Sequence, residues 1–166
     1  GCSAPNFAVP LYNAALGMAR LCDPHELTEA RATACRKITS AMTAFPEMVS
    51  GYGEFDEQLM KVGEGKLVTK RGAEGFQIVG VMPGVIAPDA PGLGIAFKVS
   101  DGDASRMADD LTTSNRVRPA VAIEILRQLG ALSSQQEQAL AGFGPVKSIK
   151  NHQNILTGQS RPAFKL

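Results

Sequence analysis

The hydrophobic pattern of this 166-residue chain changes its period at Gly63-Glu64-Gly65. Before this break, apolar residues recur at the spacing of amphipathic helices, and that spacing returns after Asp103. Between the two helical regions, three stretches have the composition or alternation of strands: residues 66–71, 76–82 and 95–99. This switch predicts an α+β fold, in which an antiparallel sheet is packed with helices. We expect residues 1–166 to form a single domain, because a chain of this length can bury one sizeable core.

Helix boundaries are predicted from caps, prolines and glycines. Asp23 with Glu26, and Ser134 with Glu137, have the spacing of capping boxes, so a helix is expected to begin at each pair. The other predicted boundaries are a start at Pro10, an end at Pro46, a short helix over residues 55–62, a start near Pro119 and a stop at Gly130.

The turn Gly72-Ala73-Glu74-Gly75 predicts a hairpin between the first two strands, with Lys70 just before it. In a strand, Lys70 shares a face with Val68, and Gly72 lets a ligand or another backbone come close. The Ala73 N–H could then point into a cleft, and a cation with an available N–H suits a developing oxyanion in acyl transfer. The spacing alone favours the plainer interpretation, a solvated lysine beside a turn, and leaves the catalytic one open.

The sequence contains no convincing nucleophile for such a site. No serine precedes a lysine in the Ser-x-x-Lys spacing, and there is no phosphate loop or dinucleotide fingerprint. A Cys2 thiolate could hold a metal or act as a nucleophile, but no cysteine or histidine lies nearby in sequence. Taken alone, Cys2 is better interpreted as a small buried residue.

Charge and composition exclude some partners. The formal net charge of +1 gives no attraction to nucleic acid or to an anionic membrane surface, and no apolar run approaches the 20 or so residues of a membrane span. The three cysteines, Cys2, Cys22 and Cys35, fit no close-set metal or redox spacing, which favours a reducing compartment and a cytoplasmic location.

Five stretches together resemble the bacterial L-asparaginase II family, which has a serine β-lactamase-like fold. They are GCSAPNFAVPLYNAALGMARL, AMTAFPEMVSGYGEFDEQLM, KLVTKRGAEGFQIVG, GLGIAFKVSDGD and AVAIEILRQLG. The resemblance runs in order through most of the chain and covers only the C-terminal half of that family. It implies that this chain is part of a larger β-lactamase-like domain, whose N-terminal half carries the Ser-x-x-Lys nucleophile.

The resemblance implies hydrolysis of L-asparagine to L-aspartate and ammonia through a serine acyl-enzyme. Lys70 would then belong to a Ser–Lys arrangement, Gly72 would keep the strand edge open, and the Ala73 N–H would be an oxyanion donor. Arg71 stands where β-lactamases have a threonine, and its guanidinium could serve the substrate carboxylate. Cys2 would help to hold a zinc ion, with a cysteine and a lysine from the N-terminal half.

Two other functions remain as alternatives. One is a non-catalytic module that binds a ligand in a substrate-shaped cleft, and the other is a β-lactamase-like amidase or esterase of different specificity. The expected partner is L-asparagine, without nucleic acid or membrane, and a homodimer is among the assemblies we expect. The polar stretch from Arg106 to Pro119 is expected at the rim of the cleft.

Overall fold

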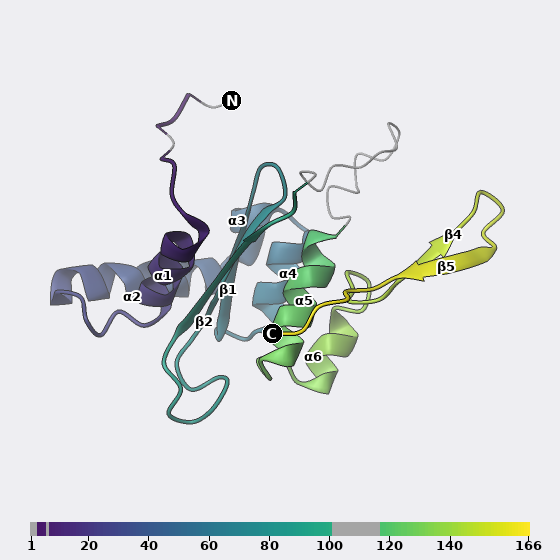
Figure 1. Ribbon diagram of the computed structural model, residues 1–166. Coiled ribbons are helices and arrows are strands. Elements are labelled where there is room, and N and C mark those ends of the chain that lie inside the picture. Colours follow the sequence, from purple (N-terminus) through teal and green to yellow (C-terminus); the bar gives the residue numbers. More distant parts are fainter. Residues whose placement is uncertain (1–2, 6, 101–116) are drawn as a thin grey trace.

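The computed structural model describes residues 3–5, 7–100 and 117–166, and within them helices lie on both faces of a three-stranded antiparallel sheet (Figure 1). Helices α1 (Leu11–Cys22) and α2 (Glu29–Ala44) cover one face. Helices α4 (Phe55–Val62) and α5 (Arg118–Gln128) cover the other, with the short helix α6 (Ser134–Ala139) beyond them. The predicted α+β class is therefore confirmed. No helix in the described part of the chain is long and apolar enough to cross a membrane.

The sheet has the order β1-β2-β3, formed by β1 (Leu67–Gly72), β2 (Phe76–Val81) and β3 (Leu93–Lys98). All three predicted strands are present, although β3 begins and ends somewhat earlier than its alternating residues indicated. The predicted hairpin is also present, because Gly72 pairs with Phe76 across the turn. Glu74 and Gly75 have φ angles of 58° and 73°, and a glycine adopts this left-handed conformation without steric cost.

The predicted helices over residues 55–62 and from Pro10 and Pro119 are confirmed, and Gly130 follows α5 with a φ angle of 68°. The predicted cap at Asp23 is wrong, because α2 begins at Glu29 after Thr28. The capping box of α6 uses Ser133 and Gln136, one residue before the predicted pair. Pro46 both follows α2 and opens the short helix α3 (Pro46–Ser50).

Alternation along the strands divides the buried residues between the two faces of the sheet. Leu67, Val79 and Val81 point towards α4 and α5 and form the main core with Phe55, Leu59, Ile123 and Leu126. On the opposite face, Val68 packs against Met18 and Cys22 of α1. Gly80 and Gly94 are paired on this second face, and their missing side chains allow α1 to lie close to the sheet.

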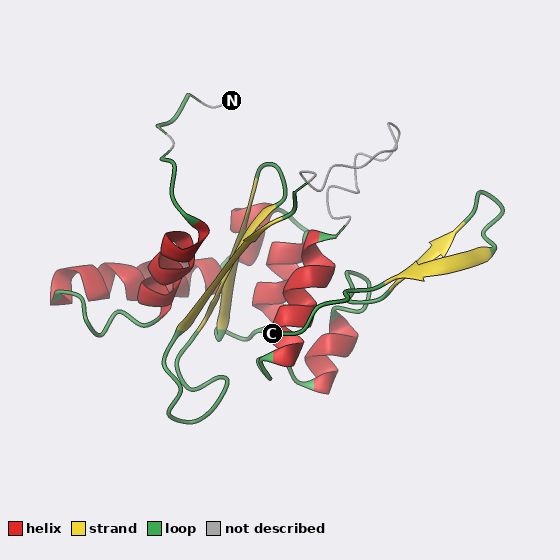
Figure 2. Ribbon diagram, viewed as in Figure 1, coloured by secondary structure: helices red, strands yellow, loops and turns green. Residues whose placement is uncertain are grey.

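Two further strands, β4 (Lys147–Lys150) and β5 (Leu156–Ser160), form a separate antiparallel ribbon that projects from the helices (Figure 2). All residues of β5 are exposed. Beyond the ribbon, the C-terminus returns to α5. There the Gln128 amide donates to the Phe164 carbonyl (3.0 Å) and accepts from the Leu166 N–H (2.9 Å).

Candidate active site at the end of strand β1

Lys70 lies near the end of β1 on the face that also carries Val68, as its position in the strand predicts. Val68 is buried against α1, whereas Lys70 is exposed. The Lys70 Nζ donates a hydrogen bond to the Arg71 carbonyl oxygen at 3.2 Å. In the part of the chain that the structure describes, the ammonium group has no acidic partner, so it presents its charge at the strand end.

Arg71 is on the opposite face of the strand and is held by two residues at the beginning of α4. Its guanidinium pairs with the carboxylate of Glu54, and both side chains are about one-third exposed. Its backbone N–H donates to the Asp56 Oδ2 at 2.6 Å. The guanidinium is therefore positioned, and its N–H groups outside the Glu54 pair could bind a second carboxylate.

Gly72 and Ala73 complete the exposed end of β1, and we call residues 70–73 the strand tip. A Cβ atom at Gly72 would lie 2.9 Å from Cδ1 of Phe76. The Phe76 ring therefore already fills the space that a larger side chain at position 72 would need. Ala73 is exposed in the turn, and its N–H donates no hydrogen bond among the residues described. Glu74 forms an exposed ion pair with Lys98 at 3.5 Å, which contributes little to stability. A cation and an accessible N–H thus occur within four residues of one chain segment.

Beneath the tip is a buried polar cluster that the sequence analysis missed, formed by Asp56, Thr69, Gln77 and Arg118. The Gln77 amide donates to Asp56 and Thr69 and accepts from the Arg118 guanidinium. One signal in the sequence could have found it. Gln77 shares its strand face with Val79 and Val81, and a polar residue in the apolar face of a strand requires a buried partner.

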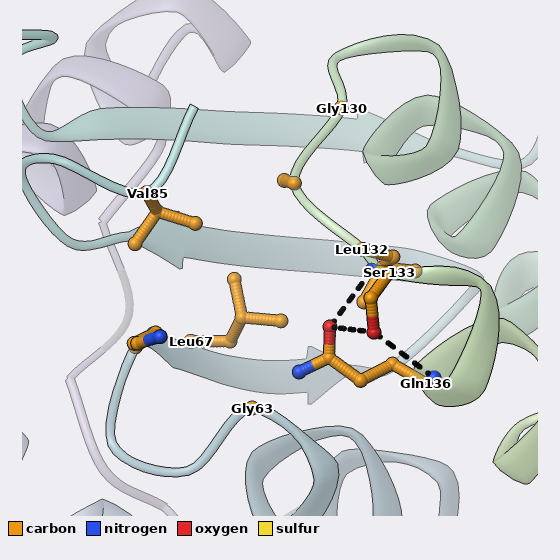
Figure 3. A pocket seen from close by; sticks show the side chains of 9 residues that line it. Gly63, Leu67, Val85, Gly130, Leu132, Ser133 and Gln136 are labelled. Carbon is orange, nitrogen blue, oxygen red and sulfur yellow. Dashed lines mark hydrogen bonds between the residues drawn. The ribbon is translucent and has the colours of Figure 1, made fainter. Parts of the chain in front are cut away.

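The opposite end of β1 contains a different hollow, a cavity of about 260 Å³ beside Leu67, Val85 and Leu132 (Figure 3). Lys66 also lines this cavity, and two of its other polar residues, Ser133 and Gln136, bind one another in the capping box of α6 (Figure 3). The Gln136 amide also donates to the Val62 carbonyl at 2.6 Å. Because Lys70 is at the other end of the strand, this cavity does not belong to the tip.

Comparison with known protein families shows the family to which the chain belongs. The family model of L-asparaginase II matches residues 1–162, a range that includes the whole tip. The chain belongs to the L-asparaginase II family. A search of curated protein sequences found no match. Membership in the L-asparaginase II family points to hydrolysis of L-asparagine in general, with L-asparagine as the substrate.

The predicted metal ligand of this L-asparaginase II family member, Cys2, lies outside the described residues, as does most of the polar stretch 106–119. Among the residues that are described, no three His, Cys, Asp or Glu side chains come together in a group that could hold a metal ion. Cys22 is buried against Met18 and Val68 in the smaller core cluster. Burial raises the pKa of its thiol to about 12, which keeps it protonated.

Proposed function

We propose that this chain supplies part of the active site of an L-asparagine amidohydrolase that forms a serine acyl-enzyme. The observation that supports the proposal is the strand tip itself. The Lys70 ammonium and the Ala73 N–H occur together there, with Gly72 between them, in a chain matched by the L-asparaginase II model over residues 1–162. The nucleophilic serine is proposed to come from a Ser-x-x-Lys segment N-terminal to Gly1, within a serine β-lactamase-like domain.

The proposed reaction has two steps. The serine Oγ attacks the side-chain carboxamide carbon of asparagine, and ammonia leaves as the C–N bond breaks. Water then attacks the resulting ester and releases L-aspartate with the free serine. In both steps a tetrahedral oxyanion forms, and the Ala73 N–H would donate to it. The positive charge of Lys70 would lower the free energy of the serine alkoxide and of the oxyanion.

Arg71 is proposed to bind the α-carboxylate of the substrate. Its pairing with Glu54 restricts the guanidinium before substrate arrives, which reduces the entropy lost on binding. Gly72 is proposed to keep the strand edge accessible to the substrate. A larger residue at this position would also clash with the Phe76 ring. Cys2 is proposed as one zinc ligand, with the remaining ligands from the N-terminal segment, and no step of the reaction above depends on that metal.

The proposal is tested by Lys70→Ala in the complete protein, with ammonia release from L-asparagine as the measurement. Turnover is expected to fall by roughly two to four orders of magnitude, the range typical for the loss of one oxyanion-stabilising or proton-transfer group. Lys66→Ala is the matched control. It removes the same charge from an exposed lysine directly before β1, and its turnover is expected to stay close to that of the unmodified protein. Unchanged turnover in Lys70→Ala would remove Lys70 from the mechanism.

The same assay separates the two alternative functions. A complete protein that binds L-asparagine without releasing ammonia would be a binding module, and one that hydrolyses a generic ester but not asparagine would have a different specificity. The coding sequence upstream of Gly1 gives a second test. A reading frame that continues into a Ser-x-x-Lys segment supports the enzyme, and a start codon directly before Gly1 contradicts it.

A further inference from the structure

We propose that Asp56 is a positioning residue for the strand tip, and that a directed chain of buried hydrogen bonds from Arg118 through Gln77 sets its geometry. This inference rests on the proposed function of Lys70 and Ala73. Asp56 touches neither substrate nor reacting atoms. It acts through the backbone of Arg71, which joins Lys70 to Gly72.

Both oxygens of the Asp56 carboxylate are used. Oδ2 accepts the Arg71 backbone N–H at 2.6 Å, and Oδ1 accepts the Gln77 side-chain amide at 2.9 Å. Asp56 is only 1% exposed, so water cannot replace these bonds. The contact joins residues 15 apart in sequence and fixes α4 to the end of β1.

The hydrogen bond from the Arg71 N–H to Asp56 is important because β1 is an edge strand. In the described part of the chain, β1 pairs with β2 on one side and with no strand on the other. Backbone groups on that side of an edge strand lack ladder partners, and strand ends readily open locally. The Asp56 carboxylate supplies the missing acceptor for the Arg71 N–H, and Glu54 holds the Arg71 side chain from the same end of α4.

The hydrogen bonds have a fixed direction, which makes the arrangement specific. The Arg118 guanidinium donates to the Gln77 Oε1, and the Gln77 Nε2 donates to Asp56. A cation on one side and a carboxylate on the other therefore determine the orientation of the Gln77 amide. The Thr69 hydroxyl accepts the second Gln77 hydrogen and donates to the Ile78 carbonyl at 2.9 Å.

The direction of these bonds also provides the test. Asp56→Asn keeps the shape of the side chain but removes its charge and turns one acceptor into a donor. If the oxygen of the introduced asparagine accepts the Arg71 N–H, the amide hydrogens of that asparagine face the amide hydrogens of Gln77. If the Gln77 amide turns over to avoid this, its hydrogens face the hydrogens of the Arg118 guanidinium. One bond must be lost in either case, so the strand end shifts. A misplacement of about 1 Å can cost on the order of 100-fold in rate, and we expect turnover per folded molecule to fall about 10- to 100-fold.

The matched control in the complete protein is Glu57→Gln. Glu57 is as buried on α4 as Asp56, but it bonds to Lys61 and to the Gly53 N–H instead of β1. This variant is expected to lower thermal stability and to leave turnover per folded molecule within about threefold of the unmodified protein, because its lost bonds do not reach the strand tip.

A double variant that combines Asp56→Asn with Gln77→Glu tests the direction of the bonds. The introduced glutamate can accept from both Arg118 and the introduced asparagine, and that asparagine can accept the Arg71 N–H. The Thr69 hydroxyl can turn its proton towards the glutamate. If Asp56→Asn lowers turnover about 100-fold, we expect the double variant to be at least about tenfold more active than Asp56→Asn. Gln77→Glu alone places two carboxylates side by side and is expected to be no more active than Asp56→Asn.

Hydrogen exchange provides a measurement that depends neither on activity nor on the folding of a variant. In the unmodified protein, the Arg71 amide proton is expected to exchange as slowly as those of the central strand β2, although it points away from β2. Exchange at the rate of an unbonded edge amide would overturn the proposal, as would full turnover in Asp56→Asn or a loss equal to that of Glu57→Gln. If Lys70→Ala loses turnover as expected and Asp56→Asn keeps full turnover, only this inference fails. If Lys70→Ala is fully active, the proposed function fails whatever the hydrogen exchange shows.

Discussion

Gly94 is expected to be the least replaceable glycine between the sheet and α1. It lies in β3 beneath α1, and a Cβ atom there would be 2.6 Å from the Ala19 nitrogen and 2.8 Å from the Ala15 carbonyl carbon, and closer still to the Ala15 oxygen. These are backbone atoms of a helix, which cannot rotate away as a side chain can. In Gly94→Ala, α1 must therefore recede from the sheet by about 1 Å or more to restore normal contact distances.

The cost follows from what α1 buries. Met18 and Cys22 pack on Val68, and a gap of about 0.5–1 Å already loses about a quarter to a half of each dispersion contact. Overpacking of this kind typically costs about 1–3 kcal/mol, and we expect about 3 kcal/mol because backbone must move. For a chain of this size, about 3 kcal/mol corresponds to a fall of roughly 6–12 °C in Tm.

Thermal unfolding followed by circular dichroism at two wavelengths measures this fall, and urea unfolding gives the free energy independently. Gly17→Ala is the control on the same helix, because a Cβ atom there meets nothing within 4 Å. Alanine is the better helix former, so this variant is expected to gain up to about 1 kcal/mol. If Gly94→Ala melts within about 2 °C of the unmodified protein, the close approach of α1 to β3 is not what holds these layers together.

Two further predictions concern Asp23 and Cys2. The Gly92 N–H and His25 lower the pKa of Asp23, and Asp23 in turn raises the pKa of His25. In Asp23→Asn, the pKa of His25 measured by NMR titration should therefore return towards about 6.5. The lowered pKa of Asp23 stabilises the fold above about pH 3.8, and this contribution is lost as the pH falls. The difference in unfolding free energy between the unmodified protein and Asp23→Asn should therefore become smaller in acid. A difference that does not change with pH would contradict this role of Asp23. The complete protein is expected to contain zinc, measured by mass spectrometry, and to lose it in Cys2→Ala but not in Cys35→Ala. Equal zinc in all three proteins would exclude Cys2 as a ligand.

Patterns of neighbouring residues predicted much of the fold and the location of the tip. The change of period at Gly63-Glu64-Gly65 predicted where helices give way to strands, and Gly72 to Gly75 predicted the hairpin. Asp23 shows where this approach fails. Its carboxylate suits a helix cap, but it accepts the Gly92 N–H at 2.8 Å, and that donor is 69 residues away in sequence. A short polar side chain near a helix start can form a hydrogen bond with the first turn of the helix or with a residue far away in sequence. The sequence does not reveal that distant partner.

The sequence by itself determined the three strands of the sheet, several of the helices, the turn that follows Lys70 and the face of β1 on which Lys70 lies. These depend on side-chain periodicity and backbone preferences, which act over a few residues. Only the tertiary structure decided that Asp56 holds the Arg71 backbone, that Glu54 pairs with the Arg71 side chain, and that Gln77 is buried between two charges. Each of these contacts joins residues far apart in the chain, because a buried polar group bonds to whichever partner the packing of α4, α5 and the sheet brings within reach.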